Sequence, residues 1–253
     1  MFLSEPAPTQ FDLHFRVAGI PVRIHPLFWL ISLAVGFQGE DPVRLLIWVG
    51  VVFVSILVHE LGHALTMQFF GQRARVVLYA MGGMAVADAS PWGIGRGHHY
   101  RSSREQILIS AAGPGAGFLL AGATVGLVFA AGGRVQFELV HGFLPYALFV
   151  PSPTVGEAWF WLVNFLVQVN IFWGLVNLLP VYPLDGGQIA QEICVRQDPY
   201  NGTARCLWLS MVVAVTVAVV GAVVLQDRYL AILFGWLALS SYLTWQQLGG
   251  GRG

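Results

Sequence analysis

The sequence predicts an all-α polytopic membrane protein of about six transmembrane helices, with short membrane-associated β segments. Of the 253 residues, 56% are hydrophobic and only 10% are charged, whereas soluble domains carry about 25% charged residues. The mean hydropathy is +0.68. The hydrophobic residues also gather in stretches that approach the roughly 20 residues needed to cross a bilayer. Because the net charge is zero, no basic field favours nucleic acid, and we expect no nucleic-acid partner.

Residues 1–253 are predicted to form a single membrane-embedded domain in contact with the lipid bilayer. The first predicted span is shorter than a bilayer requires, and the other five approach or exceed that length. An even number of spans places both chain ends on the same side of the membrane. The predicted spans lie near residues 26–37, 42–70, 104–131, 157–179, 204–225 and 229–248.

The arginines indicate the orientation of these spans. With the N-terminus inside, ten of the thirteen arginines lie on inside segments, and only Arg44, Arg134 and Arg228 lie outside. Cytoplasmic segments of membrane proteins carry such an excess of positive charge. We therefore expect an integral membrane protein with both termini in the cytoplasm.

Two short regions have β-like patterns. Residues 11–24 alternate around a glycine and lead into the first span, and residues 74–87 contain two apolar runs around Gly82-Gly83, which predicts a hairpin. The polar, glycine-rich stretch from 88 to 103 includes His98-His99 and is interpreted as a solvated loop at the cytoplasmic interface.

The second span contains the segment His59-Glu60-Leu61-Gly62-His63, which matches H-E-x-x-H. On a helix, residues four apart share a face, so His59 and His63 can bind one metal ion. Glu60 can then act as general base on a water whose pKa is lowered by zinc. The alternative is a pair of core histidines, but burying them in so apolar a run without a metal would be costly.

A catalytic zinc usually takes three protein ligands, so a third should come from elsewhere. The best candidate is Asp185, which follows a long apolar span. Pro180 and Pro183 exclude a regular helix before it, and irregular backbone at membrane depth is tolerated where it lines a cavity or is buried in protein. The alternative role, compatible with metal binding, is that Asp185 caps a helix starting at Gly186.

Two asparagines lie seven residues apart in the fourth span and so share a helix face. Asn177 can donate to a developing oxyanion or position a substrate carbonyl, and Asn170 can do the same. For both residues, the alternative is a hydrogen bond that holds neighbouring helices together.

With these segments in hand, the chain resembles the site-2 protease family of intramembrane zinc metalloproteases. HELGH is similar to the zinc motif of that family, and NLLPVYPLDG is similar to its second motif. The opening GIPVRIHPLFWL and the segment LYAMGGMAV also resemble the corresponding family segments. These resemblances cover most of the chain.

The resemblance implies a three-helix catalytic core with three accessory helices. It implies one Zn²⁺ per chain, bound by His59, His63 and Asp185, with Glu60 as catalytic base. The substrate would be a transmembrane or membrane-associated protein, cut at a zinc near the cytoplasmic side of a bacterial or archaeal cell membrane. We expect a minimal form without PDZ or CBS domains, in which partner recognition uses the helices, the 71–103 loop or a separate regulatory protein.

One position departs from the family pattern. In Ser110-Ala-Ala-Gly113-Pro114-Gly115-Ala-Gly117, glycine stands at 117 where the family usually has asparagine. We therefore expect Gly113, Pro114 and Gly117 to serve close helix packing.

A non-proteolytic metal-binding membrane protein or a transporter is the competing hypothesis, because ionisable groups inside a membrane also mark transport pathways. Glu60 beside the ligand pair and the absence of paired repeats in the sequence argue against it.

Overall fold

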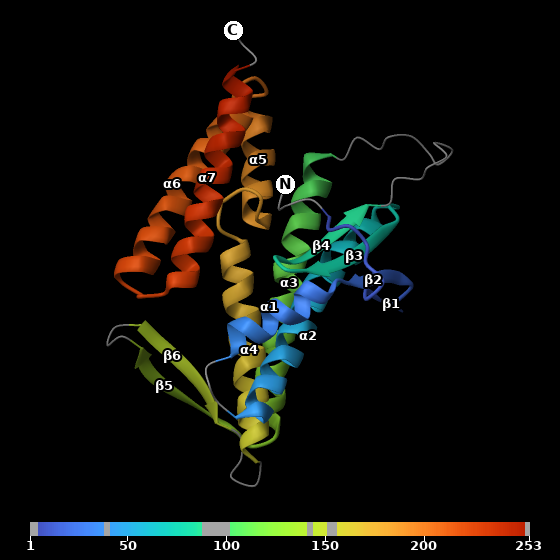
Figure 1. The fold of residues 1–253 in the computed structure, drawn as a ribbon, viewed down its shortest axis with the longest axis vertical. Helices are drawn as coiled ribbons and strands as arrows, with labels where there is room; N and C mark the ends of the chain where they lie inside the picture. Colours follow the sequence, from blue (N-terminus) through green and yellow to red (C-terminus); the bar gives the residue numbers. More distant parts are fainter. Residues whose placement is uncertain (1–4, 38–40, 88–101, 141–143, 151–155, 251–253) are drawn as a thin grey trace. The chain divides into compact units, whose positions relative to one another are not determined.

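The computed structural model describes residues 5–37, 41–87, 102–140, 144–150 and 156–250 (Figure 1). By their contacts, residues 1–97 and 112–174 form one compact unit, and residues 98–111 and 175–253 form a second. The stretch containing His98-His99 lies outside the described residues.

The described chain is mostly helical. Its helices are α1 (Pro26–Gly36), α2 (Pro42–Phe69), α3 (Ser103–Ala130), α4 (Glu157–Asn177), α5 (Asp185–Gln197), α6 (Gly202–Val223) and α7 (Arg228–Gly250). Its strands are β1 (Leu13–Val17), β2 (Ile20–Ile24), β3 (Ala74–Tyr79), β4 (Gly82–Ala87), β5 (Arg134–Val140) and β6 (Leu144–Val150).

Four of the described helices, α2, α3, α4 and α6, are long and apolar enough to cross a membrane. The remaining two predicted spans do form helices, α1 and α7. However, α1 has only 11 residues, and α7 is not among these four. The mostly helical fold is confirmed, whereas the count of six transmembrane helices is not.

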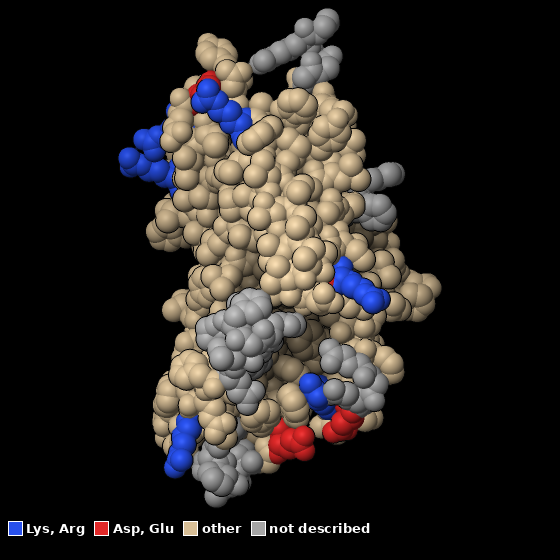
Figure 2. All heavy atoms as spheres, turned by 90° about the vertical axis from the view of Figure 1, so that its left-hand side faces the viewer, with Lys and Arg blue, Asp and Glu red and all other residues tan. Residues whose placement is uncertain are grey.

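The surfaces of the long helices are apolar. Leu46 on α2, Leu119 on α3 and Val215 on α6 are all more than half exposed, which would be costly in water. On the face drawn in Figure 2, wide stretches without acidic or basic side chains separate the few charged residues. Such a surface suits a helix that faces lipid.

The first unit contains a four-stranded sheet in the order β1-β2-β3-β4. Strands β1 and β2 form a hairpin whose two-residue turn, Ala18-Gly19, has positive φ at both positions, as a type I′ turn requires. Strand β2 then pairs in parallel with β3, after the chain has passed through α1 and α2. Strands β3 and β4 pack against α2, which brings the sheet to the helix that carries HELGH.

The hairpin predicted over residues 74–87 is confirmed, but its turn lies earlier than the sequence suggests. Tyr79 pairs with Gly82, so the turn is Ala80-Met81, and Gly82 and Gly83 are the first residues of β4. A second antiparallel pair, β5–β6, forms between the third and fourth predicted spans. The hydrophobic alternation of that segment was overlooked.

The second unit contains the antiparallel pair α6 and α7, drawn in orange and red in Figure 1. Its buried core consists of Val181, Ala214, Phe234, Leu237 and Ala238. Helix α5, which precedes the pair, was not predicted as a span because its residues are too polar, but it begins at Asp185, next to the start at Gly186 that the alternative role of Asp185 implied. It packs against α6, and Gly202 at the start of α6 lies against the backbone at Cys194.

Candidate metal site

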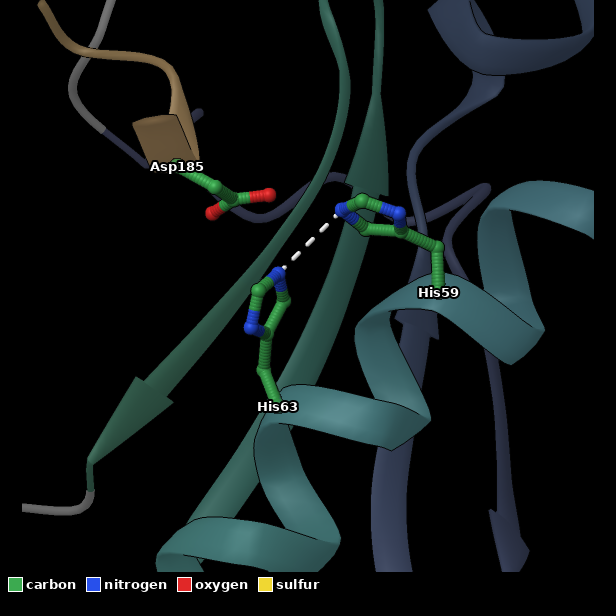
Figure 3. Close-up of side chains that lie close together, drawn as sticks. All are labelled: His59, His63 and Asp185. Atoms are coloured by element: carbon green, nitrogen blue, oxygen red, sulfur yellow. Dashed lines mark hydrogen bonds between the residues drawn. The ribbon is translucent and has the colours of Figure 1, made fainter. Parts of the chain in front are cut away.

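The two histidines of HELGH lie one turn apart on α2 and point the same way (Figure 3). The helix begins cleanly because the Asp41 side chain accepts a hydrogen bond from the Val43 amide and Pro42 occupies the first turn. His59 is 3% exposed and His63 is 7% exposed. Their Nε2 atoms lie 3.2 Å apart, so both nitrogens face a common point.

This spacing fits a zinc ion. Two nitrogens bound to a tetrahedral zinc at the usual 2.0–2.1 Å lie about 3.3–3.4 Å apart, close to the 3.2 Å between the two Nε2 atoms. Buried imidazoles are also the commonest nitrogen ligands for this metal. The same distance is that of a hydrogen bond between the two imidazoles, and it also suits two neighbouring ligands of one ion.

The backbone of α3 passes directly over the two imidazoles. A Cβ atom at Gly113 would overlap the ring of His63 and would lie 2.8 Å from His59 Nε2. On the α2 side, a Cβ at Gly62 would lie 2.5 Å from the carbonyl oxygen of Ala112. The close packing expected at Gly113 is present, and it brings α3 against the imidazoles themselves.

The side chain of Glu60 projects from α2 and packs against Gly83 at the start of β4. It is buried, and a Cβ atom at Gly83 would lie 2.7 Å from its Oε1. Sequence reasoning missed this role of β4, although the Gly82-Gly83 pair was a signal that the strand has a close neighbour. The glycine gives the Glu60 carboxylate the room that any other residue would fill.

Tyr79, at the end of β3, lies close enough to Glu60 to be affected by its charge. Burial, and next the negative charge of Glu60, raise the pKa of the Tyr79 phenol above its ordinary value. The phenol therefore keeps its proton and can serve only as a neutral hydrogen-bonding group near Glu60.

Asp185 is the first residue of α5 and is buried. The N-cap position is Leu184, which makes no side-chain capping bond, so the proposed capping role of Asp185 is not what the structure has. The predicted break before Asp185 is present, because α4 ends at Asn177 and no regular helix resumes until α5. Asp185 belongs to the second unit, whereas the two histidines belong to the first.

The irregular segment before Asp185 is held by hydroxyl groups. Ser210 Oγ on α6 accepts a hydrogen bond from the Tyr182 amide at 3.0 Å and donates to the Pro180 carbonyl at 3.3 Å. Ser241 Oγ on α7 donates to the Tyr182 carbonyl at 3.4 Å. Gly186 and Gly187 let the first turn of α5 lie against the backbone of residues 178–182.

The two asparagines predicted as substrate or oxyanion groups are both buried. Asn177 is the last residue of α4. Asn170 lies within α4, and its amide nitrogen donates to Ser55 Oγ on α2 and to the carbonyl of Leu166. Gly117 faces this amide, because a Cβ atom there would lie 3.3 Å from Asn170 Oδ1.

Residues 47–219 match Peptidase family M50. The chain belongs to this family. The match contains both HELGH and the segment ending at Asp185, and it confirms the resemblance to site-2 proteases drawn from the sequence.

Several named proteins are similar to this chain. They include "Zinc metalloprotease MJ0392" of Methanocaldococcus jannaschii, 24% identical over 190 residues that cover 74% of this chain and 46% of that protein. "Stage IV sporulation protein FB" of Bacillus subtilis is 27% identical over 187 residues, covering 74% of this chain and 52% of that protein. This M50 chain thus spans about half the length of the curated relatives it matches.

The fold itself is similar to a solved structure, "Site-2 Protease from Methanocaldococcus jannaschii". The TM-score is 0.57, the identity is 20%, and the match covers 92% of this chain and 94% of that one. At this identity the likeness shows a site-2 protease fold and nothing further.

Proposed function

We propose that this chain is a zinc metalloendopeptidase that cleaves transmembrane or membrane-associated proteins within or near the bilayer, in regulated proteolysis. The observation that carries the proposal is the pair of buried imidazoles, His59 and His63, whose Nε2 atoms lie at a spacing suited to one zinc ion. They lie beside Glu60 on an apolar helix long enough to cross a membrane, in a chain of Peptidase family M50.

One Zn²⁺ per chain would be held by His59, His63 and Asp185. The proposal is supported by the donor set, because these three buried residues offer two imidazole nitrogens and one carboxylate oxygen to a metal. Three protein ligands leave one position open, as hydrolytic zinc sites require. The names of similar proteins support the same proposal, since they include zinc metalloproteases.

When bound, the zinc would lower the pKa of water and polarise the substrate carbonyl. Glu60 takes the proton of the attacking water and delivers it to the leaving amine, the two halves of general acid–base catalysis. The buried position of Glu60 against Gly83 limits competing hydrogen bonds from bulk water. Asn177 is proposed to donate to the developing oxyanion or to position the substrate carbonyl.

The proposal extends to the location and orientation of the chain in the membrane. We propose an integral protein of a bacterial or archaeal cell membrane, with both termini in the cytoplasm and the zinc towards the cytoplasmic side. The supporting observation is the distribution of arginines, ten on predicted inside segments against three outside. The transporter hypothesis is not favoured by membership in a peptidase family.

The test compares the wild type with Glu60→Gln in liposomes that also contain tagged single-span reporter proteins. We expect the wild type to cut the reporters within or next to their membrane span, as located by mass spectrometry. Glu60→Gln should lose at least about a hundredfold in cleavage rate, because it cannot take the proton, while elemental analysis still finds one zinc per chain.

Two further variants sharpen this test. Asp185→Asn should lower zinc retention, since a neutral amide is a much poorer ligand than a carboxylate. Glu192→Gln removes a carboxylate from a half-buried position on α5 and should leave both zinc content and cleavage unchanged. Cleavage by Glu60→Gln at the wild-type rate would contradict the proposed mechanism.

A further inference from the structure

The side chain of Asn170 joins two helices of the first unit deep inside the protein. Asn170 on α4 is 2% exposed and Ser55 on α2 is 1% exposed. The Nδ2 atom of Asn170 lies 2.9 Å from Ser55 Oγ and 2.8 Å from the carbonyl oxygen of Leu166, one turn earlier on α4. Both partners are as close as good hydrogen bonds require.

The chemistry of the partners fixes which end of the amide is which. A backbone carbonyl can only accept a hydrogen bond, so the atom beside the Leu166 oxygen must be the nitrogen of Asn170. An amide nitrogen has two hydrogens, and here one is given to Leu166 and the other to Ser55. No donor hydrogen is left for a substrate oxyanion or carbonyl, whereas the alternative role predicted from the sequence, a hydrogen bond between helices, is present.

The position of Ser55 gives this bond a consequence for the metal site. Ser55 lies four residues before His59, so the two side chains share a face of α2. The Asn170 bond therefore fixes the turn of α2 directly before the first histidine. On its other side the amide faces Gly117, where a Cβ atom would already lie 3.3 Å from Oδ1, so α3 leaves room for the Asn170 side chain.

We infer that Asn170 is a positioning residue that holds His59 in its metal-binding orientation through Ser55, and that it does not contact substrate. This inference rests on the proposed function, in which His59 binds zinc. It also gives a reason for glycine at 117. The space in which a larger side chain would project from α3 is taken by an asparagine from α4.

The test is a double-mutant cycle with Ser55→Ala, Asn170→Leu and the combined variant in the full-length protein. Zinc retention is measured by equilibration against a graded series of chelator concentrations, followed by elemental analysis. Each single variant should bind zinc about three- to tenfold more weakly, the range expected for one buried hydrogen bond between membrane helices. The combined variant should be no weaker than the weaker single variant, because both changes remove the same bond.

Cleavage rates separate positioning from direct catalysis. With excess zinc, kcat of both single variants should return to within about twofold of the wild type, and KM should not change. Loss of an oxyanion donor would instead lower kcat by about a hundredfold or more whatever the zinc concentration. Ser55→Ala is a small change, so it remains informative if Asn170→Leu fails to fold.

The matched control is Asn164→Leu on the same helix. Asn164 is 1% exposed, and its amide binds the backbone of Phe149 on β6 through both its oxygen and its nitrogen. This variant also loses buried amide bonds, but its partners do not lie on α2, so its zinc affinity should match the wild type.

Two outcomes would overturn the inference. One is unchanged zinc affinity in both Ser55→Ala and Asn170→Leu. The other is a zinc-independent loss of kcat in Asn170→Leu with no effect of Ser55→Ala. Failure of the wild type to cleave any reporter would count against the proposed function alone, because zinc retention is measured without a substrate.

Discussion

The two regions that supply the candidate zinc ligands are built in opposite ways. In the first unit, His59 and His63 lie on one continuous helix, and the backbone of α3 packs against their imidazoles at Gly113. In the second unit, Asp185 follows an irregular segment whose backbone groups are bound by the hydroxyls of Ser210 and Ser241.

This difference shows two ways of holding a ligand rigid in a membrane protein. A regular helix satisfies its own backbone hydrogen bonds, so only steric packing is needed to orient its side chains. An irregular segment leaves backbone groups that must find partners inside the protein, because none are available in lipid. We call the helix region around His59 and His63 the histidine half, and the segment before Asp185 the aspartate half. The structure of the histidine half should be disturbed by added side-chain volume, and that of the aspartate half by lost hydrogen bonds.

The largest expected effect is that of added volume at Gly113. In Gly113→Ala the new methyl group would overlap His63, so the imidazoles must move, and zinc affinity should fall by up to about a hundredfold. The measurement is zinc retention in graded chelator. The control is Gly115→Ala, where a Cβ atom has nothing within 4 Å and zinc retention should not change. Equal retention in the two variants would contradict steric control of the histidine half.

A lost hydroxyl should weaken the aspartate half to a smaller extent. Ser210→Ala removes the partners of the Tyr182 amide and the Pro180 carbonyl, which should cost about 1–3 kcal/mol of stability. Amide hydrogen exchange should rise at Tyr182, and zinc affinity should fall about tenfold. Thr216→Val removes an exposed hydroxyl from the same helix and should change neither. If Ser210→Ala exchanges at the wild-type rate, the hydroxyl does not hold the segment.

The smallest expected effect is a pH-dependent change in stability, which should arise in the first unit. In the first unit, Arg75 and Arg23 bind Glu5. The hydrogen bond from Arg75 lowers the pKa of Glu5 below its ordinary value of 4.5; burial opposes this shift, and the charges of both arginines add to it. The hydroxyls that hold the second unit's segment do not titrate.

A lowered pKa in the folded state means that Glu5 contributes stability above about pH 4.5 and loses it as the pH falls through the folded value. The contribution should be less than about 1 kcal/mol, because solvent reaches the side chains of Glu5 and Arg75. Thermal unfolding of the wild type and Glu5→Gln should therefore differ at pH 7, and the difference should shrink as the pH falls below 4.5 towards the folded pKa of Glu5. A constant difference across that range would show that the ion pairs do not matter to stability.

Much of the candidate site could be predicted from local sequence patterns. The spacing of His59 and His63 places both imidazoles on one helix face wherever the helix lies, and the prolines before Asp185 interrupt a helix in any setting. The same holds for the apolar stretches that became α2, α3, α4 and α6. These features depend on residues within a few turns of one another.

Other features were decided only by the tertiary structure, because they depend on which distant segments meet. The parallel pairing of β2 with β3 joins strands separated by two helices, and α5 packs against α6, an element that follows it in the chain. The contact of Gly83 with Glu60 and the bond from Asn170 to Ser55 likewise join residues far apart in the chain. By itself, the sequence determined which chemical groups are present and on which helix face. Packing decided which of those groups already form hydrogen bonds within the protein, because a buried donor forms a hydrogen bond with an acceptor that the fold places beside it.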